Sequence, residues 1–127
     1  MKPEDMSAQW ELYARAWSAV SDAERNDILR KALAPSFTYI DPRIECKSPS
    51  EMQKNLEAFQ GRQPGGRFGL RDCLPHHDVA LVNWQLIKGD GTASNTGYDF
   101  VQFAPSGQIA RITGFFAKPS APAPSCS

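Results

Sequence analysis

The spacing of apolar residues changes near residue 67, and this change restricts the folds open to the chain. Before residue 67, apolar side chains recur at steps of three and four, as on one face of a helix. After it they alternate, as on the two faces of a strand. The elements follow in the order helix, helix, strand, helix and then several strands, which predicts an α+β fold. We expect a cone-shaped, curved antiparallel (mixed) sheet with three helices of the N-terminal half packed on its concave face.

The first predicted helix is marked by a single apolar stripe. Its members are separated by four, three, four and three residues: Met6, Trp10, Tyr13, Trp17 and Val20. The simplest interpretation of these side chains, Tyr13 included, is a helix face buried in the core.

Two further helices are predicted from capping signals. Ser21 with Glu24 forms a capping-box pattern at the start of the second, and Pro35 ends it. Residues 48–51, Ser-Pro-Ser-Glu, supply an N-cap, a proline at the first position and a capping glutamate for the third. Gly61 is the expected end of that helix.

Five strands are predicted, over residues 36–41, 67–74, 79–87, 97–103 and 109–116. Short turns separate the last four strands, so these should form an antiparallel meander. The outer face of this sheet is unusually apolar, with Leu81, Ile87, Phe100 and either Ile109 or Ile112. A homodimer packed through this face of the sheet is therefore expected.

Length and composition exclude several functional classes. The 127 residues are expected to form one domain over residues 1–117, followed by a disordered Pro/Ala/Ser tail over 118–127. Lys+Arg and Asp+Glu each number 14, which argues against nucleic-acid and membrane partners. Three widely spaced cysteines and no long apolar N-terminal run predict a protein of the reducing cytoplasm.

Asp41 is the first candidate for a functional acid. It shares a strand face with Phe37 and Tyr39 and directly precedes Pro42. An acid beside two aromatic rings could be desolvated, which would raise its pKa into a useful range for proton transfer. An Asp-Pro pair is also an ordinary turn signal, and a pairing with Arg43 would weaken Asp41 as a base.

Asp99 is the second candidate, in the strand over residues 97–103. Buried without a cation it would stay protonated and could donate a hydrogen bond together with Tyr13. The alternative is a structural ion pair between Asp99 and Arg111 on the next strand.

Three stretches together resemble a known family. "YARAWSAVS", "FTYIDP" and "GYDFVQFAPSGQIARITGFF" are similar to the SnoaL-like branch of the nuclear-transport-factor-2-like superfamily, which includes ketosteroid isomerase and small polyketide cyclases. The resemblance covers about residues 8–117. It implies the cone fold, and the same scaffold also hosts proteins that bind ligands or partners without catalysis.

The resemblance also implies roles for three residues. Asp41 stands where the isomerase has its general base, and Tyr13 and Asp99 stand where it has its oxyanion donors. In the cyclases, a single Asp on the late strand, in a context like Gly97, Asp99 and Phe103, is the acid or base. The loop after Asp41 departs from the family, since Arg43 and Glu45 bring charges near the site.

A small apolar molecule is the expected ligand, in a pocket walled by aromatic side chains. The predicted lining is Trp17, Phe37, Tyr39, Phe59, His77, Trp84, Phe103 and Phe116. No metal or cofactor is expected, because adjacent His76 and His77 point to opposite faces of an extended segment and make a poor chelate. Residues 63–69 lack the strand, helix and Lys-Ser/Thr pair of a phosphate loop.

These features favour an enzyme that moves a proton next to a carbonyl group, with Asp41 or Asp99 as acid or base and Tyr13 as a donor. The alternatives are a module that binds a small apolar ligand without chemistry, and an interaction domain whose dimer face matters more than its pocket.

Overall fold

The computed structural model describes residues 2–116, and these residues form three helices and a six-stranded sheet. The sheet has the strand order β2-β1-β6-β5-β4-β3, antiparallel throughout except where β1 lies parallel to β6. The elements are α1 (Pro3–Arg15), α2 (Asp22–Ala32), β1 (Leu33–Ile40), β2 (Glu45–Cys46), α3 (Pro49–Arg62), β3 (Arg67–His76), β4 (Val79–Ile87), β5 (Ala93–Phe103) and β6 (Ile109–Phe116). The predicted α+β class is confirmed, and so are the three helices and the meander from β3 to β6.

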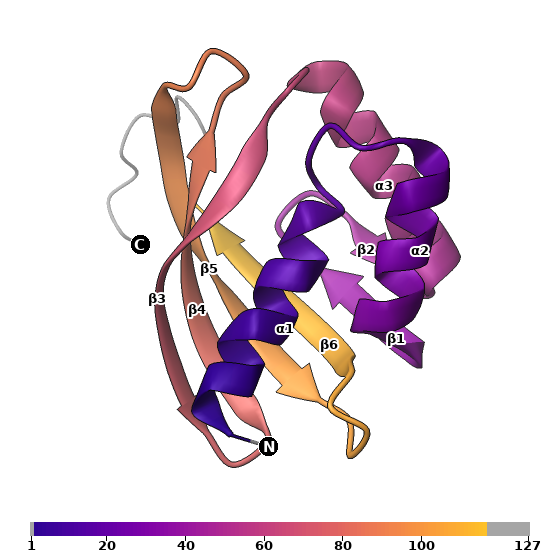
Figure 1. Ribbon diagram of the computed structural model, residues 1–127, viewed down its shortest axis with the longest axis vertical. Coiled ribbons are helices and arrows are strands. Elements are labelled where there is room, and N and C mark those ends of the chain that lie inside the picture. The colour runs from indigo at the N-terminus through magenta and orange to yellow at the C-terminus, as the bar shows by residue number, and fades with distance from the viewer. Residues whose placement is uncertain (1, 117–127) are drawn as a thin grey trace.

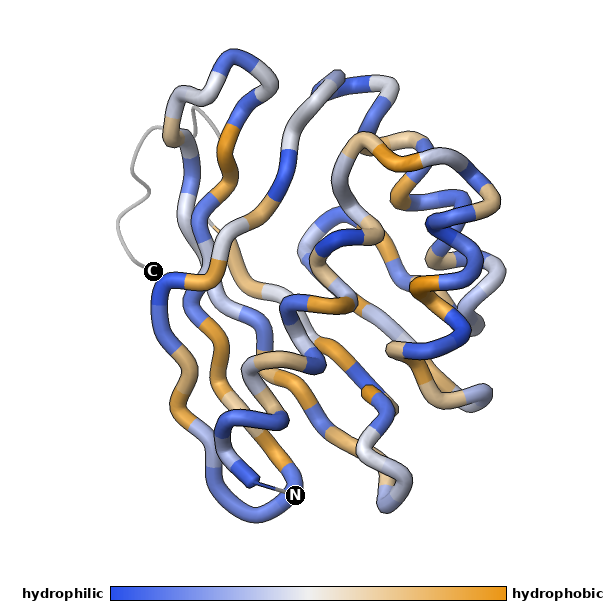
Figure 2. Tube along the Cα trace, viewed as in Figure 1, coloured by the Kyte–Doolittle hydropathy of each residue, from blue (hydrophilic) through white to orange (hydrophobic). Residues whose placement is uncertain are grey.

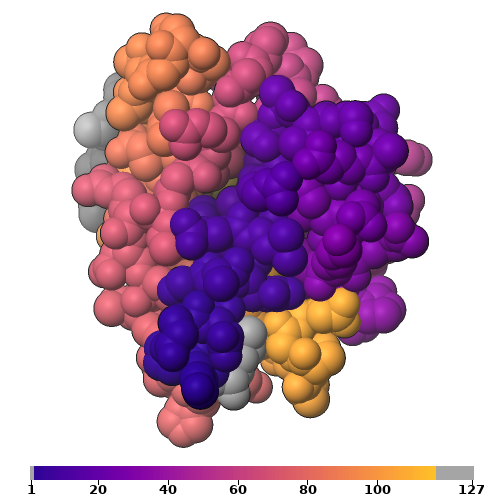
Figure 3. Space-filling model, viewed as in Figure 1, coloured from indigo at the N-terminus to yellow at the C-terminus, as the bar shows by residue number. Residues whose placement is uncertain are grey.

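The helices all lie on one side of the curved, open sheet (Figure 1). Helix α1 crosses the strands, while α2 and α3 lie together beside β1 and β2. In the space-filling view, side chains of α1 and α2 form much of the visible face (Figure 3). The concave side of the sheet is therefore covered by helices, and its other side is left without a covering layer among the described residues.

Alternation along the strands separates a buried face from an outer face. In β4, the buried side chains of Ala80, Val82 and Trp84 alternate with the exposed Leu81 and half-buried Asn83. Figure 2 shows the same alternation of hydrophobic and hydrophilic residues along the strands. Paired residues on neighbouring strands have their side chains on the same face, so the buried face and the outer face continue across the whole sheet.

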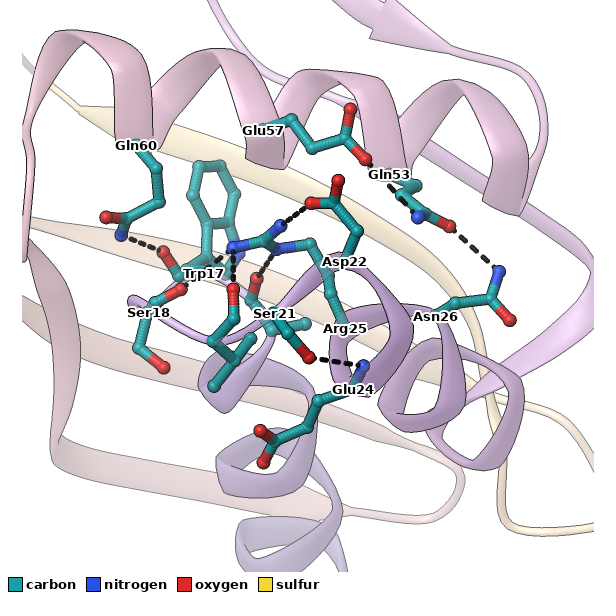
Figure 4. Close-up of polar contacts among 12 residues, drawn as sticks. Trp17, Ser18, Ser21, Asp22, Glu24, Arg25, Asn26, Gln53, Glu57 and Gln60 are labelled. Atoms are coloured by element: carbon teal, nitrogen blue, oxygen red, sulfur yellow. Dashed lines mark hydrogen bonds and ion pairs between the residues drawn. The ribbon is translucent and has the colours of Figure 1, made fainter.

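Helix α1 ends at Arg15, five residues before the predicted stripe ends, so Trp17 and Val20 lie in the loop that follows. Buried Arg25 of α2 holds this loop. Its guanidinium donates hydrogen bonds to the carbonyl oxygens of Ala16, Ser18 and Val20 at 2.8, 3.1 and 3.1 Å, and to Asp22 Oδ1 at 3.0 Å (Figure 4). A chain reversal held by buried hydrogen bonds thus replaces the predicted last turn of the helix.

Both predicted N-caps are present. The hydroxyl of Ser21 accepts from the Glu24 amide and that of Ser48 from the Glu51 amide, each at 3.1 Å. The prediction was wrong about the start of the next strand, since β1 begins at Leu33 and contains Pro35. The exposed Pro35 falls where the pairing of β1 with β6 is irregular, which is where a strand tolerates proline. The short strand β2 was not predicted.

The outer face of the sheet is apolar, as predicted, and includes the predicted Leu81 together with its cross-strand partner Phe100. Ile109 and Ile112, one of which was expected there, are both fully buried. The exposed residues include Leu74, Leu81, Tyr98 and Phe115. In residues 2–116, no helix has the length and apolar character needed to cross a membrane. The predicted end of the domain at residue 117 and the predicted tail over 118–127 lie outside the described residues.

Candidate functional site

A pocket of about 220 Å³ lies between the helices and the concave face of the sheet. Its wall is a chain of aromatic rings in edge-to-face contact. The Trp17 ring centroid lies 5.2 Å from that of Phe59 and 5.0 Å from that of Phe68, and Phe68 lies 5.0 Å from Trp84. Such contacts hold large side chains in fixed positions, so the pocket is a preformed apolar hollow.

Asp99 lies in the wall of this pocket with its carboxyl group buried. Strand β5 directs it inward, opposite Val82 of β4 and Gly114 of β6. The indole N–H of Trp10 donates to Oδ2 at 2.9 Å, and that of Trp84 donates to Oδ1 at 3.2 Å. No other charged side chain in the described residues forms an ion pair with it.

Burial raises the pKa of Asp99 from 3.8 to about 6. The two indole hydrogen bonds stabilise the carboxylate and limit this rise, whereas the nearby Asp41 adds to it. A carboxyl group with a pKa near 6 can both accept and release a proton at neutral pH. The proposed ion pair with Arg111 is absent, because Arg111 lies beside Gln102 and Thr38 and donates to the Thr38 hydroxyl at 2.7 Å.

Asp41 lies just beyond the end of β1 and also lines the pocket. It is only 7% exposed, and Phe37 and Tyr39 on the same face are buried with it, as predicted. The Tyr39 hydroxyl donates to Oδ2 at 2.6 Å, and the backbone amides of Arg43 and Ile44 donate to Oδ1 at 2.8 and 3.2 Å. The sequence thus builds both a turn and a buried acid here, and Arg43 contacts Asp41 through its backbone and not through an ion pair.

Gly114 brings the two acids together. A Cβ atom at this glycine would lie 3.3 Å from Asp41 Cβ, 3.3 Å from Asp99 Oδ1 and 3.5 Å from the Tyr39 hydroxyl oxygen. A residue without a side chain at this point of β6 therefore leaves room for Asp41, after β1, and Asp99, in β5, to approach the same point of one pocket.

Tyr13 is buried near both acids but does not line the pocket. Its hydroxyl has no hydrogen-bond partner among the described residues. Burial, reinforced by Asp99, raises its pKa well above 10. Tyr39, which does line the pocket, also has its pKa raised by burial, so both tyrosines keep their protons at neutral pH.

The structure brings together five of the eight predicted lining residues: Trp17, Tyr39, Phe59, Trp84 and Phe116. Phe37 and Phe103 are buried in the core and do not reach the pocket. His77 is exposed in the turn after β3, with φ 52°, and also lies outside the pocket. Most of the aromatic wall was predictable from helix stripes and strand faces, whereas a turn residue has no periodicity to place it.

The sequence interpretation missed several lining residues. Trp10 lies one helical turn before Tyr13 on the same stripe, so its position was a usable signal. Its indole N–H, and not the Tyr13 hydroxyl, makes the contact with Asp99. The other unpredicted lining residues are Arg43, Arg62, Gln63, Phe68, Leu86 and Asn95. Residues 2–116 contain no cluster of His, Cys, Asp and Glu side chains suited to holding a metal ion.

No protein-family model matches the sequence, and no curated protein matches it. Solved structures do match. A proposed isomerase of the SnoaL-like family from Agrobacterium tumefaciens is 25% identical, with a TM-score of 0.83 over 91% of this chain and 99% of that one.

Two further solved structures show the same fold at lower identity. A proposed SnoaL-like polyketide cyclase from Jannaschia sp. CCS1 is 14% identical, with a TM-score of 0.73 over 90% of this chain and 86% of that one. A proposed ketosteroid isomerase from Kribbella flavida is 18% identical, with a TM-score of 0.67 over 96% and 84%. These similarities confirm the predicted resemblance.

Proposed function

We propose that this chain, whose fold is that of SnoaL-like members of the nuclear-transport-factor-2-like superfamily, is an enzyme that moves a proton next to a carbonyl group without a cofactor. The reaction is an isomerisation or cyclisation of a small, apolar carbonyl compound. One observation carries the proposal: Asp41, just beyond the end of β1, and Asp99 of β5 are both buried, both line a single pocket and both lie close to Gly114.

Asp99 is the residue to which we assign the proton transfer. Removing a proton from carbon next to a carbonyl requires a base that is ionised at working pH yet basic enough to accept the proton. Its pKa of about 6 meets both requirements. The two indole donors hold the carboxylate in one orientation, so that it needs no reorganisation when the substrate enters.

Tyr39 supplies a hydrogen-bond donor for the oxygen of the developing enolate. The Tyr39 hydroxyl is in the pocket and adjacent to both acids, and its proton now goes to Asp41. An incoming substrate oxygen would compete with Asp41 for that proton. Tyr13 does not line the pocket, but its buried hydroxyl lacks a partner among residues 2–116 and lies close enough to both acids to feel their charge. Its proposed role is therefore that of a donor to the acids and not to the substrate oxygen.

Exchange of α-protons for deuterium tests this proposal without knowledge of the product. Steroid-like and polyketide-like ketones are incubated with the protein in D₂O, and loss of the α-proton signal is followed by NMR. We expect exchange by the wild type, a fall of about 100-fold or more in Asp99→Asn, and a smaller fall in Asp41→Asn.

Asp72→Asn is the matched control, because Asp72 is exposed on β3 and lies outside the pocket. Its exchange rate should equal that of the wild type. An Asp99→Asn protein that is folded and still exchanges at the wild-type rate would refute the assignment of Asp99. Exchange that is abolished only in Asp41→Asn would instead favour the isomerase-like assignment of the base to Asp41.

A binding module without chemistry is the second candidate, and one observation favours it. All four carboxylate oxygens of Asp41 and Asp99 already accept hydrogen bonds from the protein. Each oxygen retains further acceptor capacity, so these bonds do not block catalysis. Ligands that bind in the pocket and never exchange α-protons would establish this second function.

We also propose that the chain forms a homodimer through the outer face of the sheet. Leu74, Leu81, Tyr98 and Phe115 are 60%, 37%, 48% and 55% exposed on this face. The pairings Leu74–Leu81 and Tyr98–Phe115 join them across neighbouring strands into an apolar surface. Light scattering should give twice the chain mass for the wild type and a monomer for folded Tyr98→Lys/Phe115→Lys.

The predicted cytoplasmic location remains a proposal. Cys46 and Cys73 are free thiols, and Cys46 is buried with its pKa raised to about 11, mainly by burial. Two cysteines that are not in disulfides are typical of a protein from a reducing compartment.

A further inference from the structure

Two arginines line the pocket together with the two acids. Arg43 belongs to the loop between β1 and β2, and Arg62 is the last residue of α3. Both are exposed, whereas Asp41 and Asp99 are buried, so positive charge lies at the mouth of the pocket and the acids lie deeper. The mouth also carries the amides of Gln63 and Asn95.

Neither arginine has a carboxylate partner within the described part of the chain. Among residues 2–116, the ion pairs involve Arg15, Arg25, Arg30 and Lys31, and no side-chain hydrogen bond is made by the guanidinium of Arg43 or Arg62. The Arg43 guanidinium lies 5.7 Å from the centre of the Phe116 ring, over an aromatic wall of the pocket. A stacked guanidinium leaves its N–H groups free at the ring's edge.

The two positive charges act on one another. Burial, and then repulsion from Arg43, lowers the pKa of Arg62, while Asp41 partly offsets this effect. Two like charges held at one opening are unfavourable until an anion lies between them, and guanidinium groups bind carboxylates with two parallel hydrogen bonds. The opening is thus charged to receive an anionic group, although the pocket behind it is apolar.

We propose that the substrate or ligand is a flat, apolar keto acid, whose carboxylate is held at the mouth by Arg43 and Arg62 while its carbonyl end enters the aromatic pocket. This inference rests on the proposed function for the position of the carbonyl group, and adds the chemical class of the rest of the molecule. A carboxylate fits better than a phosphate dianion, because Asp41 lies close enough to act on Arg62 and would repel a second negative charge.

The test compares acids with their neutral esters. The probes are 4-oxo-4-phenylbutanoate, its naphthyl analogue and the methyl ester of each, with binding measured by calorimetry at low ionic strength. We expect the wild type to bind at least one acid tenfold or more tightly than its ester. In Arg43→Gln/Arg62→Gln this ratio should fall to near one, and in Arg43→Lys/Arg62→Lys it should fall only in part, since charge is kept and the planar fork is lost.

Arg71→Gln is the control, because Arg71 is exposed on β3 and outside the pocket, and it should keep the wild-type ratio. A wild type that binds no acid more tightly than its ester overturns the inference, and so does a ratio that survives in the double glutamine variant. The readout is binding alone. A protein that prefers acids to esters but exchanges no α-protons would therefore refute the proposed catalysis and leave this inference standing. A protein that exchanges α-protons of neutral ketones but does not prefer acids would refute this inference and leave the proposed catalysis standing.

Discussion

Asp99 shows how the surroundings of a single side chain shift its pKa. Burial raises the pKa, and the hydrogen bonds from Trp10 and Trp84 keep the rise moderate. Without those donors a buried carboxyl group would stay protonated through neutral pH. The indoles therefore set the pH range in which Asp99 can accept a proton.

The raised pKa of Asp99 has a consequence for stability. Its pKa in the folded state, about 6, exceeds the ordinary value of 3.8, so between these values the folded state binds more protons than the unfolded state. Ionising Asp99 thus costs stability, and the free energy of unfolding should fall as pH rises from about 4 to 6, by on the order of 3 kcal/mol. Asp99→Asn should lack this contribution.

Urea unfolding of the wild type and of Asp99→Asn at several pH values measures the contribution of Asp99 to the free energy of unfolding. The difference between the two proteins is the relevant quantity, because Asp27 and Asp90 have lowered pKa values and act with the opposite sign at lower pH. If the free energies of unfolding of the two proteins change in parallel between pH 4 and 7, Asp99 has an ordinary pKa.

Trp10→Phe should raise the pKa of Asp99 further. The substitution keeps an aromatic ring in the core and removes the stronger of the two hydrogen bonds that stabilise the carboxylate. The titration of the Asp99 carboxyl carbon by NMR measures the change. Trp17→Phe is the matched control, since Trp17 lines the same pocket and makes no hydrogen bond to Asp99. An equal shift of the Asp99 pKa in both variants would mean that loss of ring volume, and not loss of the donor, is responsible.

The sequence predicted both acids at this scale, because strand alternation places Asp41 and Asp99 on inward faces. It did not predict what each acid contacts. Trp10 and Asp99 are 89 residues apart, and only the packing of α1 over β5 brings them within hydrogen-bonding distance. The sequence could not decide between a turn and a buried acid at Asp41 either, because the structure contains both at this residue.

At the scale of elements, two glycines on neighbouring strands determine how closely the site is packed. In β6, an alanine at Gly114 would bring a methyl group to 3.3 Å from both acids. In β5, an alanine at Gly97 would place it 2.5 Å from the Trp84 ring and 2.6 Å from the Phe115 carbonyl oxygen. The second contact includes backbone, which cannot move aside as a side chain can.

Gly97→Ala should therefore destabilise the protein by about 1–3 kcal/mol or more, and Gly114→Ala by less. Gly114→Ala should nevertheless slow α-proton exchange, because it pushes apart the groups that act on the substrate. Thermal unfolding and the exchange assay measure the two effects. A Gly114→Ala protein with unchanged exchange would show that the closeness of the acids is not required.

Arg25 is the residue that connects α1 to α2. Arg25→Met keeps much of its length but leaves the carbonyl oxygens of Ala16, Ser18 and Val20 without their donor. We expect a loss of about 3 kcal/mol in urea unfolding, from buried acceptors left unpaired. Arg30→Met on the same helix removes only an exposed ion pair with Asp27 and should cost less than about 1 kcal/mol. Similar losses in the two variants would mean that the loop is held by other contacts.

Elements with regular periodicity were predicted well, and irregular ones were not. The limits of β4 and β6 match the prediction residue for residue. The end of α1 was missed because Trp17 continues the helical spacing although the chain has already turned. The two-residue strand β2 is too short to show any alternation.

At the scale of the whole molecule, the fold explains why the two buried acids and the aromatic wall lie in one place. A curved sheet covered by helices on one side encloses a hollow, and the inward residues of β1, β4, β5 and β6 meet there. The order of elements was enough to predict this architecture. The charged mouth was not predictable, because Arg43 and Arg62 come from a loop and a helix end whose relative placement follows only from the complete fold.

The pH dependence of α-proton exchange tests the central claim most directly, namely that a buried Asp99 takes the proton. With a ketone that the wild type exchanges, the rate should rise with pH, reach half its maximum near pH 6 and then level off, because only the ionised carboxylate is a base. Asp99→Asn should lack that rise. A rate that does not change across pH 6, or the same curve in folded Asp99→Asn, would contradict the claim.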